Sequence, residues 1–264
     1  MRIGKQDQPF TAICTSDAES ITVRGKDLVG EIIGKMDFTS YFWFLVTGVE
    51  PNEQQLFFAN AVLCALAEHG LVPSVVAARM TYAAAPEALQ GAVAAGLLGC
   101  GSVVLGSAEV AGRFQAECVA DWRASGDPID KVAMRNIERL RASGTKAIPG
   151  FGHPQHSAGD PRANLLLKLA DERGVSGDHV AMLRALQAAL PATIGRALPV
   201  NVNGPIPAVM LDVGWPLAAL KGLALLCRTA GLVAHLTEEA ERPIGFILSG
   251  KAAEAIEYDG PQAG

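Results

Sequence analysis

The chain has 264 residues, of which 50% are hydrophobic and 19% charged, so it is long enough to bury a substantial core in one large domain or two smaller ones. Its formal net charge of −5 lacks the strongly basic footprint of nucleic-acid-binding proteins. No signal-peptide pattern opens the chain and no uninterrupted apolar stretch reaches the roughly 20 residues that span a bilayer, so we expect a cytoplasmic protein without membrane contact.

Helical periodicity dominates the first half of the chain. A strand is predicted only near the start, in the stretch 19–28 (ESITVRGKDL). Apolar residues at helical spacing then predict two helices over 40–70, separated by a turn at Gly48 and Pro51. An alanine-rich helical stretch over 74–99 is interrupted at Pro86.

The second half repeats the same pattern. An amphipathic helix is expected over 130–143, ended by Gly144, and further helices over 162–174 and 177–195. A long apolar helical stretch over 215–243 stops before Pro243. The predicted fold class is therefore all-α.

Two changes in composition predict a domain division. The charged stretch 116–131 (AECVADWRASGDPIDK) and the Pro/Gly/Asn cluster 198–207 (LPVNVNGPIP) bracket a middle segment. We expect a small helical domain at 115–210, inserted into a large helical domain formed by 1–114 and 211–264.

The loop 149–163 (PGFGHPQHSAGDPRA) concentrates polar chemistry in an otherwise aliphatic chain. It carries His153 and His156, two of the five histidines, and it ends with Arg162 at the start of a predicted helix. Asp160 and Pro161 fit the N-cap and first-turn positions, which would fix the direction of Arg162. An imidazole beside a guanidinium can exchange a proton and bind a carboxylate. The alternative is an exposed loop with solvated histidines.

The remaining polar residues have simpler interpretations. His69 ends an apolar helix, Arg242 can be a solvated helix end, His235 is more typical of a satisfied core histidine, and His179 reads as a surface residue. No histidines share metal-ligand spacing with a carboxylate, so we expect no metal site. Five cysteines lie far apart, and their odd number argues against a disulfide framework.

Taken together, the motifs resemble one known superfamily. They are AEHG at 67–70, GSVVLGSAE at 101–109, GFGHPQHSAGDPRA at 150–163, NVNGPIPAVMLDVG at 201–214, CRTAGLVAHLTEE at 227–239 and RP at 242–243. In this order they resemble the citrate synthase superfamily, especially the short branch with citryl-CoA lyases and the citrate-cleaving end of ATP-citrate lyase. The resemblance implies a citrate synthase-like fold with an active site in the cleft between a large and a smaller domain, working as a homodimer or higher homo-oligomer.

The resemblance also implies roles for individual residues. His153 corresponds to the histidine that exchanges a proton with the substrate oxygen, and His69, Arg162 and Arg242 correspond to ligands of the substrate's carboxylate or hydroxyl groups. The backbone that receives coenzyme A corresponds to Ile148, Pro149, Gly150, Phe151 and Gly152. Two guanidiniums and an imidazole in one cleft suit a di- or tricarboxylate.

Two positions depart from the superfamily pattern. Val104 stands where citrate synthases have the histidine that stabilises the thioester enolate, and Asn203 stands where they have the catalytic aspartate. An amide has no usable basicity, so Asn203 can only offer hydrogen bonds to the enolate. Protonation of the carbanion would then need water, Glu109 or a substrate group. Pro154 and His156 also differ from the longer citrate synthases, which leaves the acyl group open.

We therefore expect a citryl-CoA lyase-like enzyme that cleaves or reversibly forms a carbon–carbon bond in a carboxylated 3-hydroxyacyl-CoA, with coenzyme A as part of substrate or product and no metal. Two alternatives follow from Asn203 and Val104. One is altered chemistry on the same fold, such as acyl-CoA thioester hydrolysis. The other is a non-catalytic protein that binds an acyl-CoA or a tricarboxylate.

Overall fold

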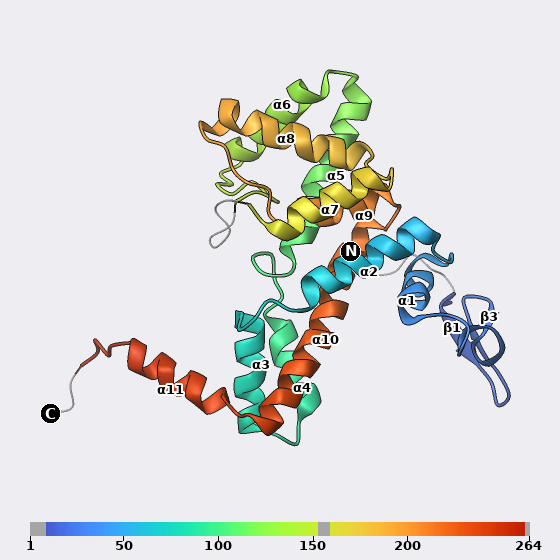
Figure 1. Ribbon diagram of the computed structural model, residues 1–264, viewed down its shortest axis with the longest axis vertical. Helices are drawn as coiled ribbons and strands as arrows, with labels where there is room; N and C mark the ends of the chain where they lie inside the picture. Colours follow the sequence, from blue (N-terminus) through green and yellow to red (C-terminus); the bar gives the residue numbers. More distant parts are fainter. Residues whose placement is uncertain (1–8, 153–158, 262–264) are drawn as a thin grey trace. The chain divides into compact units, whose positions relative to one another are not determined.

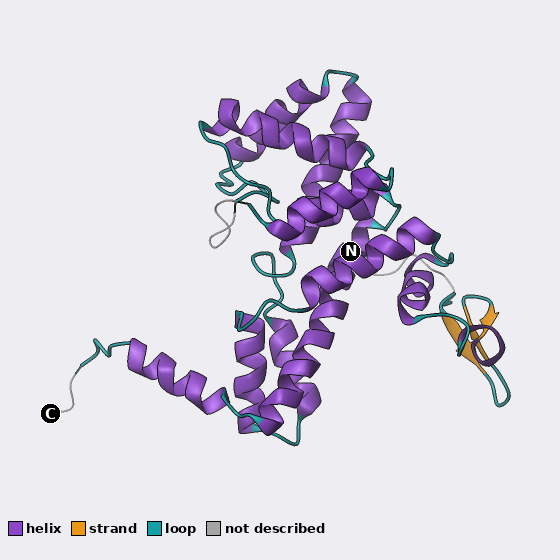
Figure 2. Cartoon of the chain, viewed as in Figure 1, coloured by secondary structure: helices purple, strands orange, loops and turns teal. Residues whose placement is uncertain are grey.

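A computed structural model of the chain describes residues 9–152 and 159–261 (Figure 1). The chain divides into two compact units, Met1–Asn60 and Ala61–Gly264. Helices make up most of the second unit, and among the described residues strands occur only in the first unit (Figure 2). The all-α fold class predicted from periodicity is therefore confirmed.

The first unit begins with a small antiparallel sheet in the order β1 (Cys14–Ser16), β2 (Ile21–Val23) and β3 (Lys26–Asp27). Arg24 and Gly25 connect β2 to β3 with φ values of 51° and 88°. Two positive φ values in a two-residue loop are typical of the turn that matches the twist of a hairpin. Strands β2 and β3 lie in the stretch 19–28 that was expected to form a strand, whereas β1 was not predicted.

Helices complete the first unit. A short π-helix, η1 (Leu28–Ile32), leads to α1 (Phe38–Thr47), and α2 (Glu53–Ala67) crosses the boundary between the units. Asp37 caps α1 by accepting a hydrogen bond from the Ser40 amide at 3.0 Å, and Gly48 ends it at φ 80°. Helices α1 and α2 confirm the two helices expected over 40–70.

One group of helices in the second unit is centred on α10 (Leu220–Glu241). Helices α3 (Pro73–Ala84), α4 (Leu89–Leu98) and the short η2 (Leu217–Ala219) pack on α10, and α11 (Gly245–Ala255) packs on α3. Gly96 of α4 lets α10 approach closely, because a Cβ there would lie 2.7 Å from a methyl carbon of Leu232. Leu232 is fully buried with residues of α3 and α4.

The same unit contains five more helices: α5 (Ser107–Ser125), α6 (Ile129–Ala142), α7 (Pro161–Glu172), α8 (Asp178–Ile194) and α9 (Pro205–Asp212). Helix α8 packs on α5, α6 and α9, and α5 also contacts α10. Helices α6, α7 and α8 match predicted helices, whereas α5, α9 and α11 were not predicted. The expected domain boundaries at 114/115 and 210/211 fall inside α5 and α9, and the domain division stays a prediction.

Helix α10, with η2, is long and apolar enough to cross a membrane by length and composition alone. Central helices of water-soluble domains have the same composition, so this property does not identify a membrane span. In this unit α10 packs against α3, α4 and α5. It also carries Arg228 and His235 toward the end of α2.

Candidate functional site

Two loops of the second unit lie side by side and build one wall of the site. Phe151 forms an isolated antiparallel bridge with Val200, and the Gly152 amide donates to the Pro199 carbonyl at 2.8 Å. Gly150 has a φ of 87°, and a Cβ there would lie 2.9 Å from the Gly204 Cα. The loop predicted to receive coenzyme A is therefore held against the loop that carries Asn203.

The backbone at Asn203 is held in place by neighbouring amide side chains. Asn201 Nδ2 donates to the Gly152 carbonyl at 2.6 Å, and Asn201 Oδ1 accepts from the Asn203 amide at 3.0 Å. Gln115, fully buried on α5, donates from Nε2 to the Gly204 carbonyl at 2.9 Å. Asn201 and Gln115 escaped the sequence analysis, because only their contacts reveal a supporting role.

The predicted cap at the start of α7 is present. Asp160 is fully buried and accepts hydrogen bonds from the Arg162 amide at 3.0 Å, from Arg162 Nε at 3.0 Å and Nη2 at 2.9 Å, and from the Val202 amide at 3.0 Å. Burial raises the pKa of Asp160, but the hydrogen bonds from Arg162 and Val202 outweigh it and bring the pKa below 3.8. Asp160 thus aims the Arg162 guanidinium and ties α7 to the Asn203 loop.

Arg162 opens onto a cavity of about 150 Å³. Its polar lining contains three residues singled out in the sequence, His69, Arg162 and Asn203. The described residues that line it are Leu66, His69, Val72, Val103, Val104, Leu105, Ser107, Arg162, Val202, Asn203 and Arg228. None of these described lining residues is an aspartate or a glutamate, so the cavity offers cations and hydrogen-bond donors to an anion.

Arg228 lines the cavity, although the sequence analysis did not single it out. It is only 3% exposed, and its Nη2 donates to the Leu66 carbonyl at 3.2 Å. Its Nε and Nη1 have no hydrogen-bond partner among the described residues. Buried donors without acceptors are rare, so this guanidinium is prepared for an anionic ligand. The available signal was a lone arginine in an apolar helix.

Two predicted residues are not part of this cavity as described. Arg242 is exposed at the C-terminal end of α10, 14 residues after Arg228, which is roughly 21 Å along a helix. One chain therefore does not bring both arginines to one ligand. His153 lies outside the described residues, as do Pro154 and His156.

The remaining evidence is similarity to known proteins. Residues 22–245 match the family model for the C-terminal domain of citrate synthase. The chain belongs to the citrate synthase family. In sequence it is 25% identical over 222 residues to the citrate synthase of Haloferax volcanii, with 83% of this chain and 55% of that protein covered. The chain thus spans about half the length of that curated relative.

Solved structures agree with the family assignment. Citryl-CoA lyase from Hydrogenobacter thermophilus is 27% identical with a TM-score of 0.83, covering 96% of this chain and 95% of that chain. ATP citrate lyase from Methanothrix soehngenii, solved with citrate and coenzyme A, is 23% identical with a TM-score of 0.77, covering 98% and 43%. Citrate synthase from Thermoplasma acidophilum is 20% identical with a TM-score of 0.66, covering 86% and 58%. The last two show the fold alone.

This citrate synthase family member has a second, basic pocket beside the loop 148–152. The pocket measures about 410 Å³ and includes Ile148, Phe151 and Gly152 of that loop. Its other lining residues are Arg141, Lys146, Ala147, Ile194, Arg196 and Leu198. The three cations were not singled out in the sequence, since single basic residues on a surface carry no motif.

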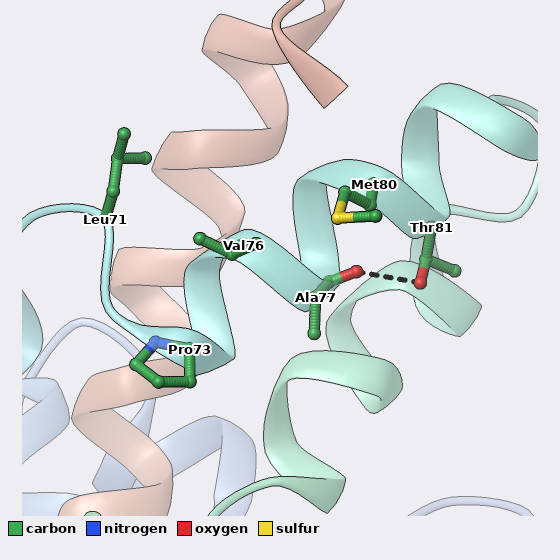
Figure 3. A pocket seen from close by; sticks show the side chains of 6 residues that line it. All are labelled: Leu71, Pro73, Val76, Ala77, Met80 and Thr81. Carbon is green, nitrogen blue, oxygen red and sulfur yellow. Dashed lines mark hydrogen bonds between the residues drawn. The ribbon is translucent and has the colours of Figure 1, made fainter. Parts of the chain in front are cut away.

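A third hollow has a different character. It lies along α3, measures about 630 Å³, and is lined by Leu71, Pro73, Val76, Ala77, Met80 and Thr81 (Figure 3). The Thr81 hydroxyl donates to the Ala77 carbonyl of its own helix at 2.8 Å (Figure 3). With no ionisable lining side chain, the hollow has no group for acid–base chemistry.

Other polar groups of this family member are already paired or protonated. Glu109, considered above as a proton source, accepts from Arg113 Nη2 at 2.7 Å and does not line the cavity. Burial raises the pKa of Cys118 to about 12 and that of Cys227 to about 11, so both remain thiols. Across the described residues, no group of three or more His, Cys, Asp or Glu side chains is arranged to hold a metal ion.

Proposed function

We propose that this chain cleaves a carbon–carbon bond in a carboxylated 3-hydroxyacyl-CoA of the citryl-CoA type and releases an acyl-CoA and an oxo acid. The observation that carries the proposal is the match over 96% of this chain and 95% of the citryl-CoA lyase from Hydrogenobacter thermophilus. The cavity that joins Arg162 and Arg228 supports it, because two guanidiniums suit a substrate with carboxylate groups.

In the proposed reaction His153 takes the proton of the substrate hydroxyl. The hydroxyl carbon becomes a carbonyl as its bond to the α-carbon of the thioester breaks, and the electron pair of that bond passes into the thioester as an enolate. Asn203 donates a hydrogen bond to the enolate oxygen, and a proton from water completes the acyl-CoA. None of the described lining residues is a carboxylate, which supports this direction because forming the enolate from an acyl-CoA needs a base.

The basic pocket is the proposed site of the coenzyme's phosphates. Coenzyme A carries a diphosphate and a ribose phosphate, and the pocket offers Arg141, Lys146 and Arg196. Its position beside Ile148 and Gly152 fits the loop 148–152, to which the superfamily resemblance assigns the coenzyme. No metal takes part in this proposal, and coenzyme A acts only as part of substrate and product.

A homodimer is the proposed assembly, in the cytoplasm and without nucleic-acid or membrane partners. Helix α11 exposes Phe246 at 73% and Ile247 at 59%, and we assign both to the dimer surface because contact with a second copy would bury them. Helix α11 contacts α3, and we assign the apolar hollow along α3 to the same surface. Arg242 would then serve the cavity of a second copy, since it lies far along α10 from the cavity of its own chain.

Product analysis tests the proposed activity. Purified protein incubated with citryl-CoA, or with related hydroxyacyl-CoA esters, is expected to release equal amounts of oxo acid and acyl-CoA, and His153→Ala is expected to lower the rate roughly 10²- to 10⁴-fold. Free coenzyme A without oxo acid would instead indicate thioester hydrolysis. Thermal stabilisation by the esters without any product would indicate a binding protein.

A further inference from the structure

A chain of charged side chains leads from the cavity to the end of α10. Its first member is Glu68, which directly follows α2 and precedes His69. Glu68 Oε1 accepts hydrogen bonds from the His69 amide at 2.9 Å and from the Gly70 amide at 2.5 Å. One carboxylate oxygen thereby fixes the backbone that presents His69 to the cavity.

The second oxygen of Glu68 faces α10. Its Oε2 lies 3.0 Å from His235 Nε2 and 3.9 Å from Arg228 Nη1. Burial raises the pKa of Glu68, but hydrogen bonds from His235 and from the Gly70 amide outweigh it and lower the pKa. An ionised Glu68 therefore stands beside the cavity-lining guanidinium, too far from it to use up its hydrogen-bond donors.

A glycine makes this arrangement sterically possible. Arg228, Gly231 and His235 follow one another at spacings of three and four on α10, so they share one face of the helix. A Cβ at Gly231 would overlap the carbonyl oxygen of Ala67 at the end of α2. The missing side chain lets the end of α2 approach α10, and Glu68 then fits between Arg228 and His235.

His235 is anchored from its other side by Arg79, which is 3% exposed. Arg79 Nη1 lies 3.4 Å from His235 Nδ1, so Nδ1 is the acceptor and Nε2 carries the hydrogen shared with Glu68. Arg79 also donates from Nε to Glu239 at 2.5 Å and from Nη2 to the Arg242 carbonyl at 3.2 Å.

Arg79 needs neither His235 nor Glu68 to be satisfied. Glu239 is itself buried and forms a close ion pair with Arg79, and Glu238 accepts from Arg79 Nη1 at 2.8 Å. Two carboxylates are enough to compensate a buried guanidinium. The contacts from Arg79 through His235 to Glu68 are therefore additional to the ion pair between Arg79 and Glu239. These additional contacts are the ones that reach the cavity.

We propose that Glu68 and His235 are positioning residues that hold the His69 backbone and the Arg228 guanidinium in the cavity, with Arg79 as their anchor at the end of α10. The assignment of the cavity to substrate rests on the proposed function. The hydrogen-bonded arrangement itself does not depend on it, and the two are tested separately.

Hydrogen exchange tests the arrangement without any substrate. In the full chain, Glu68→Ala is expected to speed exchange of the His69 and Gly70 amides at least tenfold, because both lose their acceptor. Lys168→Gln, which removes an exposed ion pair with Glu172 on α7, is the matched control and should leave both amides unchanged. Unchanged exchange in Glu68→Ala would overturn the proposal.

Kinetics with citryl-CoA test the effect on the substrate. His235→Leu should raise KM roughly tenfold with kcat within about threefold, and His235→Gln, which keeps a donor toward Glu68, should restore most of the lost affinity. Glu68→Ala should raise KM in the wild-type background but by less than about twofold in Arg228→Met, because Glu68 acts largely through Arg228.

A purely structural role for Glu68 would give the opposite pattern. The losses from Glu68→Ala and Arg228→Met would then multiply fully, and His235→Gln would recover no affinity, which would overturn the proposal. If the wild type turns over no hydroxyacyl-CoA, the proposed function is wrong. In that case hydrogen exchange, together with calorimetric binding of citrate by the same variants, decides on the positioning role.

Discussion

Asn203 is the residue on which the reaction direction depends. Its backbone N–H donates to Asn201 Oδ1, and the following Gly204 carbonyl accepts from the buried Gln115. The side-chain amide of a residue with a firmly held backbone can donate a hydrogen bond to a developing negative charge, but it cannot remove a proton from carbon. The residues around Asn203 therefore suit an enolate that is formed by carbon–carbon cleavage better than one that is formed by removing a proton from an acyl-CoA.

Asp160 is expected to contribute stability that depends on pH. Because its pKa in the folded chain is below 3.8, its contribution is fully present near neutral pH and is lost as the pH falls through the folded-state value. Asp160→Asn leaves Arg162 with a weakened partner and should lower the free energy of unfolding by about 3 kcal/mol at pH 7. Urea unfolding at pH 7 and pH 3 measures the difference, which should shrink at pH 3. A loss of equal size at both values would contradict this account.

Sequence motifs identified the residues of the cavity only where a local pattern existed. His69 at a helix end, Arg162 after its cap and Asn203 in its loop were all predicted, and the structure brings them to one cavity. Their catalytic and binding roles remain predictions. Arg228 was missed because it becomes a site residue only when α10 packs against the end of α2.

Helix α10 offers a matched test of close helix packing. Gly231→Ala would place a methyl group against the Ala67 carbonyl and should lower the free energy of unfolding by about 1–3 kcal/mol. Gly222→Ala lies on the same helix with nothing within 4 Å of its new Cβ, and should stabilise the chain by up to about 1 kcal/mol. Thermal unfolding of both variants compares them, and equal effects would contradict the packing.

The predicted helices show which elements periodicity can identify. Helices α6 and α7 have clear amphipathic or capped sequences and were expected. Helix α9 starts with Pro205 and has Pro207 in its first turn, so its sequence resembles a loop although proline fits the start of a helix. Helix α5 begins after Gly106 without a side-chain cap, which hid its start.

At the scale of the molecule, the proposed dimer predicts complementation between inactive subunits. At citryl-CoA concentrations near the wild-type KM, Arg228→Ala and Arg242→Ala should each show little activity, because each removes a proposed carboxylate ligand and so raises KM. If Arg242 serves the cavity of the second copy, mixed dimers have one intact site, and an equal mixture reassembled together should recover about one quarter of wild-type activity. A mixture no more active than the separate variants would contradict this assembly.

The sequence motifs, taken in order, identified the family, and the match over residues 22–245 confirms it. The division into a large domain, 1–114 with 211–264, and a small domain, 115–210, stays a prediction. Its boundaries were drawn from composition, and composition does not reveal that the continuous helices α5 and α9 cross them.

The most direct test of carbon–carbon cleavage without a carboxylate base is the deuterium content of acetyl-CoA after reaction in D2O. With citryl-CoA, the wild type should yield acetyl-CoA with one deuterium in its methyl group. With acetyl-CoA alone, the wild type should exchange the methyl protons no faster than the reaction without protein, whereas Asn203→Asp should exchange them roughly 10²-fold faster than the wild type. The account would be contradicted if no acetyl-CoA formed from citryl-CoA. It would also be contradicted if the wild type exchanged the methyl protons of acetyl-CoA as fast as Asn203→Asp does.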